Sequence, residues 1–328
     1  MKAYTLRSYG APDQLELADV ATPVPAAGEV LVRVRATSVN PYDWHGLRGE
    51  PYVARLMPGG LRLLRPPKLL ILGCDMAGEV EAVGSGVTGF RPGDGVFAVL
   101  EQGGFAEYVS VPERLLARKP ENLSHEQAAA VPMAGITALL AVRDVGRAEP
   151  GQRVLVNGAS GGVGTFAVQI ARALGASVDA VCRARNADLV RSIGATGVID
   201  YASEDFTRGG RRYDLLIDIA GSRTAVACRR VLAPKATMVI VGGPAGRWIQ
   251  PVGHVVSALA LGPLVSQRIA MANAVGCAKQ EILTALTALI EDGAVTPVIG
   301  RTYAFTEIPE AIAYQEQGLA TGKVVVTI

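Results

Sequence analysis

A glycine-rich turn at residues 158–164, with the sequence GASGGVG, is the first stretch of the chain with clear chemical potential. The apolar run 154–156 precedes it, and apolar residues recur at helical spacing between 166 and 174. A buried strand, a glycine turn and a helix N-terminus together bind a pyrophosphate, because glycines allow close backbone approach and the free N–H groups face the negative charge. Ala159 occupies the first glycine position of G-x-G-x-x-G, so the match is imperfect. The order of elements nevertheless favours a dinucleotide-binding βαβ unit over an ordinary βα turn.

Two arginines, Arg183 and Arg185, follow the next predicted strand, which covers residues 177–182. At this place, about 20 residues beyond the glycine turn, a protein that binds NAD carries an acid for the ribose 2′-hydroxyl, whereas arginine accommodates the 2′-phosphate of NADP. Residues 182–186 contain two cations and no acid, which favours NADPH. Asp179, earlier in the same strand, weakens this prediction. The alternative is that both arginines are solvated loop charges.

The elements that must position these residues are of two kinds. Residues 1–120 contain short segments that alternate apolar and charged residues, such as 29–36, and this pattern predicts a compact barrel-like domain. From Ser124 the chain becomes helical, and after the glycine turn strands alternate with helices, which predicts a parallel, doubly wound sheet. A last predicted strand, residues 323–328, can rejoin the first domain.

Composition limits the possible functions. The chain has 328 residues, of which 49% are hydrophobic and 19% charged, so we expect about two domains and a sizeable core. The net charge of +2 gives no electrostatic case for a nucleic-acid partner. The N-terminus lacks an apolar signal segment, and the cysteines form no C-x-x-C pair, so we expect a reduced, cytoplasmic protein without a structural zinc cluster. These cysteines are Cys74, Cys182, Cys228 and Cys277.

One apolar stretch, residues 252–278, tests whether the chain spans a membrane. Gly262-Pro263 interrupts it and Arg268 lies near its middle, so neither half reaches the roughly 18 apolar residues that a spanning helix needs. We therefore expect no membrane span and assign the stretch to a pocket wall or a subunit contact. Because so long an apolar run is unusual on the surface of a monomer, it also predicts a homodimer.

Six short motifs occur in order along nearly the whole chain. They are residues 40–43 (NPYD), 72–78 (LGCDMAG), 91–94 (RPGD), the glycine turn, 194–201 (GATGVIDY) and 322–325 (GKVV). In this order the motifs resemble the zinc-free quinone oxidoreductase and enoyl reductase branch of the medium-chain dehydrogenase/reductase superfamily. The resemblance implies an α/β protein with a GroES-like β-barrel domain, residues 1–123 and 268–328. It also implies a Rossmann domain with a doubly wound parallel sheet, residues 124–267.

The resemblance implies an NADPH-dependent, zinc-independent oxidoreductase that transfers hydride to a quinone or an α,β-unsaturated carbonyl compound. Two alternatives remain open: an NADPH-binding sensor or partner protein without turnover, and a zinc-dependent alcohol dehydrogenase. Zinc relatives carry cysteine near residues 40–45 and Gly-His-Glu where this chain has Gly73-Cys74-Asp75. A catalytic zinc needs three protein ligands around one point. Asp43, His45, Cys74 and Asp75 match no usual ligand set, so we expect no metal.

By the same resemblance, Asn40, Asp43 and His45 are assigned to catalysis. A hydride transfer without a metal needs a donor near the carbonyl oxygen, where charge develops, and histidine has a suitable pKa for this role. The alternatives are that His45 is a structural hydrogen-bonding residue and that Asp43 caps a helix that begins at Trp44.

The remaining assignments concern the substrate and the cofactor. Tyr42, Tyr52 and Met57 are assigned to a small hydrophobic substrate, because the lining is mostly apolar or aromatic. The residues assigned to NADPH are Thr137, Ala159, Ser160, Gly161, Gly162, Val163, Gly164, Arg183, Arg185, Tyr201, Gly221, Gly242, Gly243 and Lys323.

Overall fold

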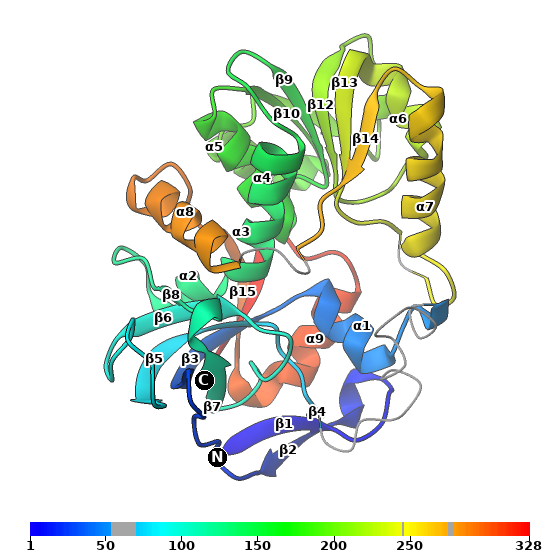
Figure 1. Cartoon of the computed structure of the whole chain (residues 1–328). Helices are drawn as coiled ribbons and strands as arrows, with labels where there is room; N and C mark the ends of the chain where they lie inside the picture. Colours follow the sequence, from blue (N-terminus) through cyan, green and yellow to red (C-terminus); the bar gives the residue numbers. More distant parts are fainter. Residues whose placement is uncertain (54–69, 245, 275–278) are drawn as a thin grey trace. The chain divides into compact units, whose positions relative to one another are not determined.

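The computed structural model describes residues 1–53, 70–244, 246–274 and 279–328 (Figure 1). The contacts divide the chain into two compact units. Unit 1 consists of Met1–Met133, Ala278–Asp292 and Pro297–Ile328, and unit 2 of Ala134–Cys277 and Gly293–Thr296. The expected boundaries, at 123/124 and 267/268, both lie earlier in the chain than these. The second boundary lies later than expected because residues 268–271 form a strand of the unit 2 sheet.

The larger sheet of unit 1 has seven strands, of which six follow the order β15-β16-β3-β5-β6-β8, while β7 also pairs with β3. Their bounds are β3 (Glu29–Val39), β5 (Asp75–Val83), β6 (Gly95–Val99), β7 (Tyr108–Pro112), β8 (Ala117–Arg118), β15 (Ile299–Ala304) and β16 (Lys323–Thr327). A second sheet, in the order β2-β1-β4, contains β1 (Lys2–Leu6), β2 (Leu15–Asp19) and β4 (Leu70–Ile71). The barrel-like domain predicted from the alternating segments is thereby confirmed.

The C-terminal strand β16 closes this domain. It pairs antiparallel with β3, with Val325 opposite Ser38, and parallel with β15. The prediction that the last strand rejoins the first domain is therefore confirmed. Hydrophobic side chains from β3, β5 and β6, such as Val32, Met76 and Val96, form one buried cluster of the unit.

Helices α1 (Pro41–Arg48), α2 (His125–Ala129), α8 (Lys279–Glu291) and α9 (Ile308–Glu316) also belong to unit 1. Asn40 caps α1 in a capping box with Asp43, and the left-handed backbone of Gly49, with φ of 61°, ends the helix. The helix therefore begins at Pro41, not at Trp44, because proline suits the first helical position. Arg48 of α1 binds both carboxylate oxygens of Glu316 of α9 through its Nε and Nη2, at 2.5 and 2.9 Å.

Unit 2 contains a six-stranded, wholly parallel sheet in the order β11-β10-β9-β12-β13-β14. This order is that of a dinucleotide-binding fold, in which ligands bind beyond the carboxyl ends of the strands where the order reverses, here between β9 and β12. The strands are β9 (Arg153–Asn157), β10 (Ser177–Cys182), β11 (Gly197–Asp200), β12 (Tyr213–Asp218), β13 (Leu232–Ile240) and β14 (Arg268–Met271).

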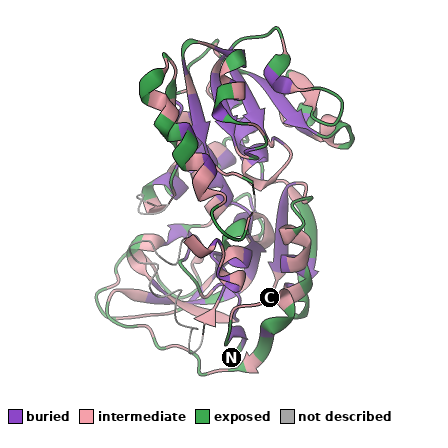
Figure 2. Cartoon of the chain, turned by 90° about the vertical axis from the view of Figure 1, so that its right-hand side faces the viewer, coloured by how far each residue is buried: buried purple, intermediate pink, exposed green. Residues whose placement is uncertain are grey.

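Helices α3 (Pro132–Leu139), α4 (Gly162–Ala173), α5 (Ala187–Ser192), α6 (Ala225–Cys228) and α7 (Val252–Leu261) accompany these strands along the chain. Val154, Leu155 and Val156 of β9 are completely buried, as their continuous apolar sequence predicts for a central parallel strand. Figure 2 shows the strands of this sheet as buried and much of the outer helical surface as exposed. The predicted doubly wound parallel sheet is confirmed.

The apolar stretch 252–278 divides into α7 and the edge strand β14, and residues 275–278 lie outside the described part. Within the described residues, no helix has both the length and the apolar character needed to cross a membrane. Several of its apolar side chains are exposed: Val256, Leu259, Leu264 and Met271.

Candidate active site

The glycine turn leads from β9 into α4, and its glycines set the course of the backbone between the two. Gly158, with φ of 91°, makes the tight turn, and its N–H donates to the carbonyl of Val181. Ala159, which stands at the first glycine position of the motif, is buried. The tight turn expected of the first glycine is made by Gly158 instead. A Cβ on Gly164 would lie 2.1 Å from the Gly158 carbonyl oxygen, so only glycine allows the helix to pack this closely. Gly161 caps α4 with extended backbone, leaving the helix N-terminus to meet an anion.

Arg183 and Tyr201 lie together at the carboxyl ends of β10 and β11. The Arg183 Nε donates to the Tyr201 hydroxyl at 2.8 Å, and the guanidinium carbon lies 5.7 Å from the ring centroid. Arg185 is exposed on the next turn. Asn186 ties this loop to the glycine turn through a 2.9 Å hydrogen bond from its amide to the Ser160 hydroxyl. The structure therefore brings the predicted cations into the loop that adjoins the glycine turn.

Asp179, the residue that weakened the NADPH prediction, is buried within β10 and already has two partners. Its Oδ2 accepts from Arg211 at 2.7 Å and from the Tyr213 hydroxyl at 2.8 Å. Burial, and then the hydrogen bond to Asp179, raise the pKa of Tyr213, which therefore stays protonated as a donor. The Asp179 carboxylate thus stabilises the interior of unit 2 and does not lie at the strand end, where a ribose acid is expected.

Asp218, at the end of β12, connects the loops that follow the central strands. Its Oδ1 accepts from the Asn157 amide at 2.7 Å and from the Gly221 N–H at 3.1 Å. Asn157 also donates to the Ser222 hydroxyl at 3.2 Å. Neither Asn157 nor Asp218 is predicted from the sequence, although each is a polar residue that ends a buried apolar strand.

The predicted glycines after β12 and β13 are required by close packing. Gly221 has φ of 57°, and a Cβ there would lie 2.5 Å from the Gly243 Cα. A Cβ on Gly242 would lie 2.5 Å from the Ile219 carbonyl oxygen. Thr137, also predicted to bind the cofactor, is half-buried on α3. Val163 and Gly162 form the first turn of α4.

Lys323 lies in unit 1, where its ammonium is buried among polar side chains of β3, β5 and the start of α1. Its Nζ donates to Asn40 Oδ1 at 2.5 Å and to Asp75 Oδ2 at 3.2 Å, and Lys323 is only 3% exposed. Asp75 is fully buried and also accepts from Ser38, Asn40 and the Met133 N–H. A buried charge must be paired, and this arrangement pairs both. The Lys323 ammonium thus stabilises the buried cluster and does not lie free for a cofactor phosphate.

Asp43 lies beside this cluster and is buried together with Cys74. Burial raises the pKa of Asp43 to about 7, and Asp75 adds to the increase, while the Asn40 N–H and the Lys323 ammonium oppose it. The Asp43 Oδ2 accepts from the Asn40 N–H at 2.7 Å and lies 3.9 Å from the Cys74 Sγ. Burial also raises the pKa of Cys74 well above its usual value, so this side chain remains a thiol.

His45 is held by other contacts. Its Nδ1 lies 3.0 Å from the Glu50 carbonyl oxygen, and its ring stacks on Trp44 with centroids 3.6 Å apart. Because a carbonyl only accepts, Nδ1 carries the proton in this contact. Burial lowers the pKa of His45, although the Glu50 carbonyl opposes this effect, so the ring is neutral at pH 7.

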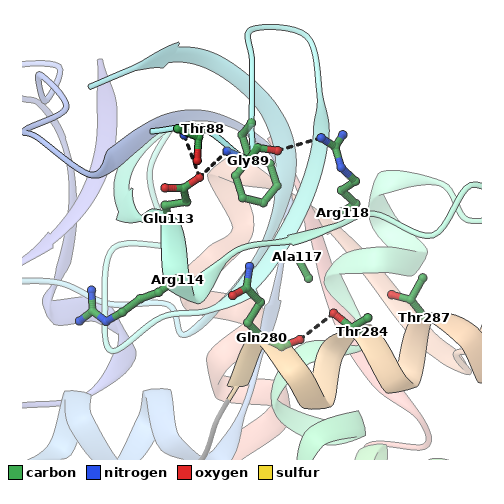
Figure 3. A pocket seen from close by; sticks show the side chains of 10 residues that line it. Thr88, Gly89, Glu113, Arg114, Ala117, Arg118, Gln280, Thr284 and Thr287 are labelled. Carbon is green, nitrogen blue, oxygen red and sulfur yellow. Dashed lines mark hydrogen bonds between the residues drawn. The ribbon is translucent and has the colours of Figure 1, made fainter. Parts of the chain in front are cut away.

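The predicted substrate residues are only partly described. Tyr42, on the first turn of α1, is 52% exposed, and Tyr52 is half-buried. Met57 lies outside the described residues. A hollow of about 570 Å³ elsewhere in unit 1 contains none of the predicted site residues (Figure 3). Figure 3 shows Glu113 accepting from the Thr88 and Gly89 backbone, and Arg118 donating to the Gly89 carbonyl.

The proposed zinc ligands do not form a metal site. Across residues 1–53, 70–244, 246–274 and 279–328, no three His, Cys, Asp or Glu side chains are arranged to hold a metal ion. Asp75 already accepts from the Lys323 ammonium and the Asn40 amide. A zinc site requires free ligands, so Asp75 in this arrangement does not fit the metal. The glycine turn, with its backbone cradle and free helix N-terminus, does fit a dinucleotide.

Two family models match the chain. Residues 26–121 match the alcohol dehydrogenase GroES-like domain, and residues 193–326 match the family described as zinc-binding dehydrogenase. The chloroplast envelope quinone oxidoreductase homolog of Arabidopsis thaliana is 34% identical over 99% of this chain and 98% of its own. The mitochondrial NAD(P)H oxidoreductase RTN4IP1 of Bos taurus is 33% identical over 100% of this chain and 89% of its own.

A solved structure extends the comparison. The mycobacterial protein Rv1454c, solved in complex with NADPH, has a TM-score of 0.85 and 26% identity and covers 100% of both chains. The fold, the glycine turn and these relatives define a medium-chain dehydrogenase/reductase with a GroES-like and a Rossmann domain. The chain belongs to the quinone oxidoreductases of this superfamily and is an enzyme, an oxidoreductase that depends on NAD(P)H.

Proposed function

We propose that this enzyme reduces a quinone or an α,β-unsaturated carbonyl compound with NADPH and without zinc. The observation that carries the cofactor choice is the Arg183–Tyr201 pair, fixed at the strand ends beside the glycine turn. Arginine binds a phosphate through charge-assisted hydrogen bonds, which NADH, lacking the 2′-phosphate, cannot form. Asp179 already accepts hydrogen bonds from Arg211 and Tyr213, so its carboxylate does not compete for the ribose of the cofactor.

In the proposed mechanism, bound NADPH supplies a hydride to an electron-poor carbon of the substrate. The N-terminus of α4 and the glycine turn bind the pyrophosphate, and Arg183 binds the 2′-phosphate. Lys323 holds Asn40 and Asp75 in one arrangement, and the capping box holds Asp43 against Asn40.

We propose His45 as the residue that donates a proton or hydrogen bond to the substrate. In the neutral ring the Nδ1 proton is engaged by Glu50, so donation from Nε2 requires the imidazolium. Since the pKa of His45 is lowered, this form becomes populated only below the ordinary histidine range. The proposed donation from His45 therefore operates at acidic pH, and at neutral pH the ring serves as a structural hydrogen-bonding residue.

Zinc independence is supported by Lys323. Its ammonium provides a positive charge among Asn40, Asp75 and Cys74, the neighbourhood where the zinc relatives are expected to carry ligands. Exhaustive dialysis against EDTA is expected to leave NADPH oxidation unchanged. If activity disappeared and returned with zinc, the zinc-dependent alcohol dehydrogenase would replace this proposal.

The test of the reaction is a steady-state screen of hydrophobic quinones and enones with NADPH, each matched to its saturated analogue. We expect oxidation of NADPH with at least one conjugated acceptor and none with the analogue, because only the conjugated compound offers hydride an electron-poor alkene carbon or a quinone ring, whereas the saturated analogue could accept it only at the carbonyl carbon. Tight NADPH binding without turnover of any acceptor would favour the sensor or partner protein.

We also propose a homodimer, with β14 and the exposed side chains Val256, Leu259 and Leu264 as the surface for a second copy. β14 is the edge strand of the unit 2 sheet, and an exposed edge is a ready template for pairing with another chain. Light scattering that gave the monomer mass of 34.2 kDa at micromolar concentration would exclude this dimer. The cytoplasmic location stays a prediction, since the two relatives carry chloroplast and mitochondrial names.

A further inference from the structure

His254, on α7, is a buried histidine that none of the preceding roles uses. It is 9% exposed, and its Nε2 lies 3.5 Å from Asp218 Oδ2. Neither atom has a hydrogen-bond partner, and both are fully shielded from solvent. Buried polar atoms are nearly always paired, because an unpaired one loses its hydration without compensation. Two such atoms facing each other therefore form a pair that needs a structural or functional explanation.

The other half of the Asp218 side chain is in contact with the predicted cofactor loops. Oδ1 binds the amide of Asn157, which directly precedes the glycine turn, and the N–H of Gly221. The Asp218 backbone carbonyl accepts from the Val241 N–H at 2.9 Å, at the start of the loop after β13. One residue thus joins the ends of β9, β12 and β13, which is the edge where the strand order reverses.

The His254 ring also packs directly against one of these loops. A Cβ on Gly243 would lie 3.4 Å from the His254 Cδ2 and 2.8 Å from the Pro251 Cβ. The backbone N–H of His254 donates to the Gln250 side chain at 3.0 Å, which fixes the start of α7. The backbone of His254 is therefore fixed at the start of α7, and the imidazole lies against both Asp218 and the loop that contains Gly243.

We propose that His254 is a positioning residue for NADPH, acting through Asp218. In the proposed arrangement the 3.5 Å separation between Nε2 and Asp218 Oδ2 closes to a hydrogen bond, which fixes the orientation in which Oδ1 binds Asn157 and Gly221. These two residues set the backbone on either side of the point where the cofactor pyrophosphate binds. His254 does not touch the cofactor, so its loss weakens cofactor binding without changing the hydride-transfer step.

The proposal rests on NADPH binding as the proposed function and is tested by direct fluorescence titration of NADPH. His254→Leu removes the donor and is expected to raise the Kd about tenfold, the effect of leaving one buried polar group unpaired. His254→Gln retains an N–H at a comparable reach and is expected to stay within about threefold of the wild type. The kcat at saturating NADPH is expected to be unchanged in both variants.

His125→Gln is the matched control, because His125 of α2 also lies 3.5 Å from a carboxylate, that of Glu79, in unit 1. It should leave the Kd unaltered. A double-mutant cycle with Asp218→Asn should show non-additive losses, since both variants interrupt one interaction.

An unchanged Kd in His254→Leu, or equal losses in the Leu and Gln variants, would overturn the positioning role. A wild-type protein that failed to bind NADPH would instead reject the proposed function. Thermal denaturation of each variant identifies any that fails to fold. If His254→Leu failed to fold, the Kd values of His254→Gln and Asp218→Asn would test the positioning role instead. A wild-type Kd for Asp218→Asn contradicts the proposal.

Discussion

Replacing Lys323 by methionine should destabilise unit 1 severely, although the change conserves volume and adds no polar group. The variant leaves Asp75 buried without its cation. Removing one partner of a buried ion pair costs about 3–5 kcal/mol. Asp75 keeps its donors Ser38, Asn40 and the Met133 N–H, so we expect a value near the lower limit. About 3 kcal/mol corresponds to a fall in Tm of roughly 6–12 °C for a domain of this size.

Equilibrium denaturation in urea, followed by circular dichroism, measures this loss. Lys2→Met provides the matched control, because Lys2 forms an ion pair with Asp19 at 2.8 Å on the surface. We expect no measurable change there, since exposed pairs are screened by solvent. The double variant Lys323→Met, Asp75→Asn should recover part of the lost free energy, because the uncompensated charge is gone. If Lys323→Met were as stable as the Lys2 variant, the buried pair would have no structural importance and the reasoning would be refuted.

Three further predictions concern individual side chains. Arg183→Ala with Arg185→Ala should weaken NADPH binding about tenfold or more and NADH binding little, as titrations of both cofactors would show; equal losses contradict the 2′-phosphate contact. Asp43→Asn should flatten the pH dependence of stability between about pH 4 and 7. The folded-state pKa of about 7 exceeds the unfolded value, so in the wild type stability is lost as pH rises through this range. A slope in urea midpoints identical to that of the wild type would refute this. His45→Phe should lower kcat more than it weakens NADPH binding, and the acid-dependent part of the pH–rate profile should disappear; an unchanged kcat assigns His45 to structure.

The sequence predicted those elements whose signal is local. The strand Ser177–Cys182 has the predicted bounds, and the glycine turn has the expected strand and helix around it. Both follow from short-range patterns: an apolar run, a turn and helical spacing. The return of the last strand to the first domain was also predicted, because the resemblance implies a barrel domain made from both ends of the chain.

Long-range pairing was not predictable from these patterns. Lys323 and Asn40 are separated by 283 positions, and no local feature shows that the lysine is buried. The Asp218–His254 contact likewise joins the end of a strand to α7, a helix whose sequence is mostly apolar and gives no local signal for this contact. β14 was missed because Arg268–Met271 lies inside a long apolar run, where periodicity cannot distinguish a strand from a helix.

The insertion of β16 between β3 and β15 has a consequence for how the chain is made. Ribosomes add about 5–20 residues per second, so the interval between the synthesis of Asn40 and that of Lys323 is on the order of 10–60 s. Throughout this time β3 has β5 and β7 beside it but lacks β16, and Asp75 lacks its cation. The N-terminal part of unit 1 must therefore remain incompletely folded while the whole Rossmann unit is translated. The Rossmann unit can fold during this time. An exposed strand edge during this period invites aggregation, so unit 1 is the part of the nascent chain that a chaperone is expected to hold.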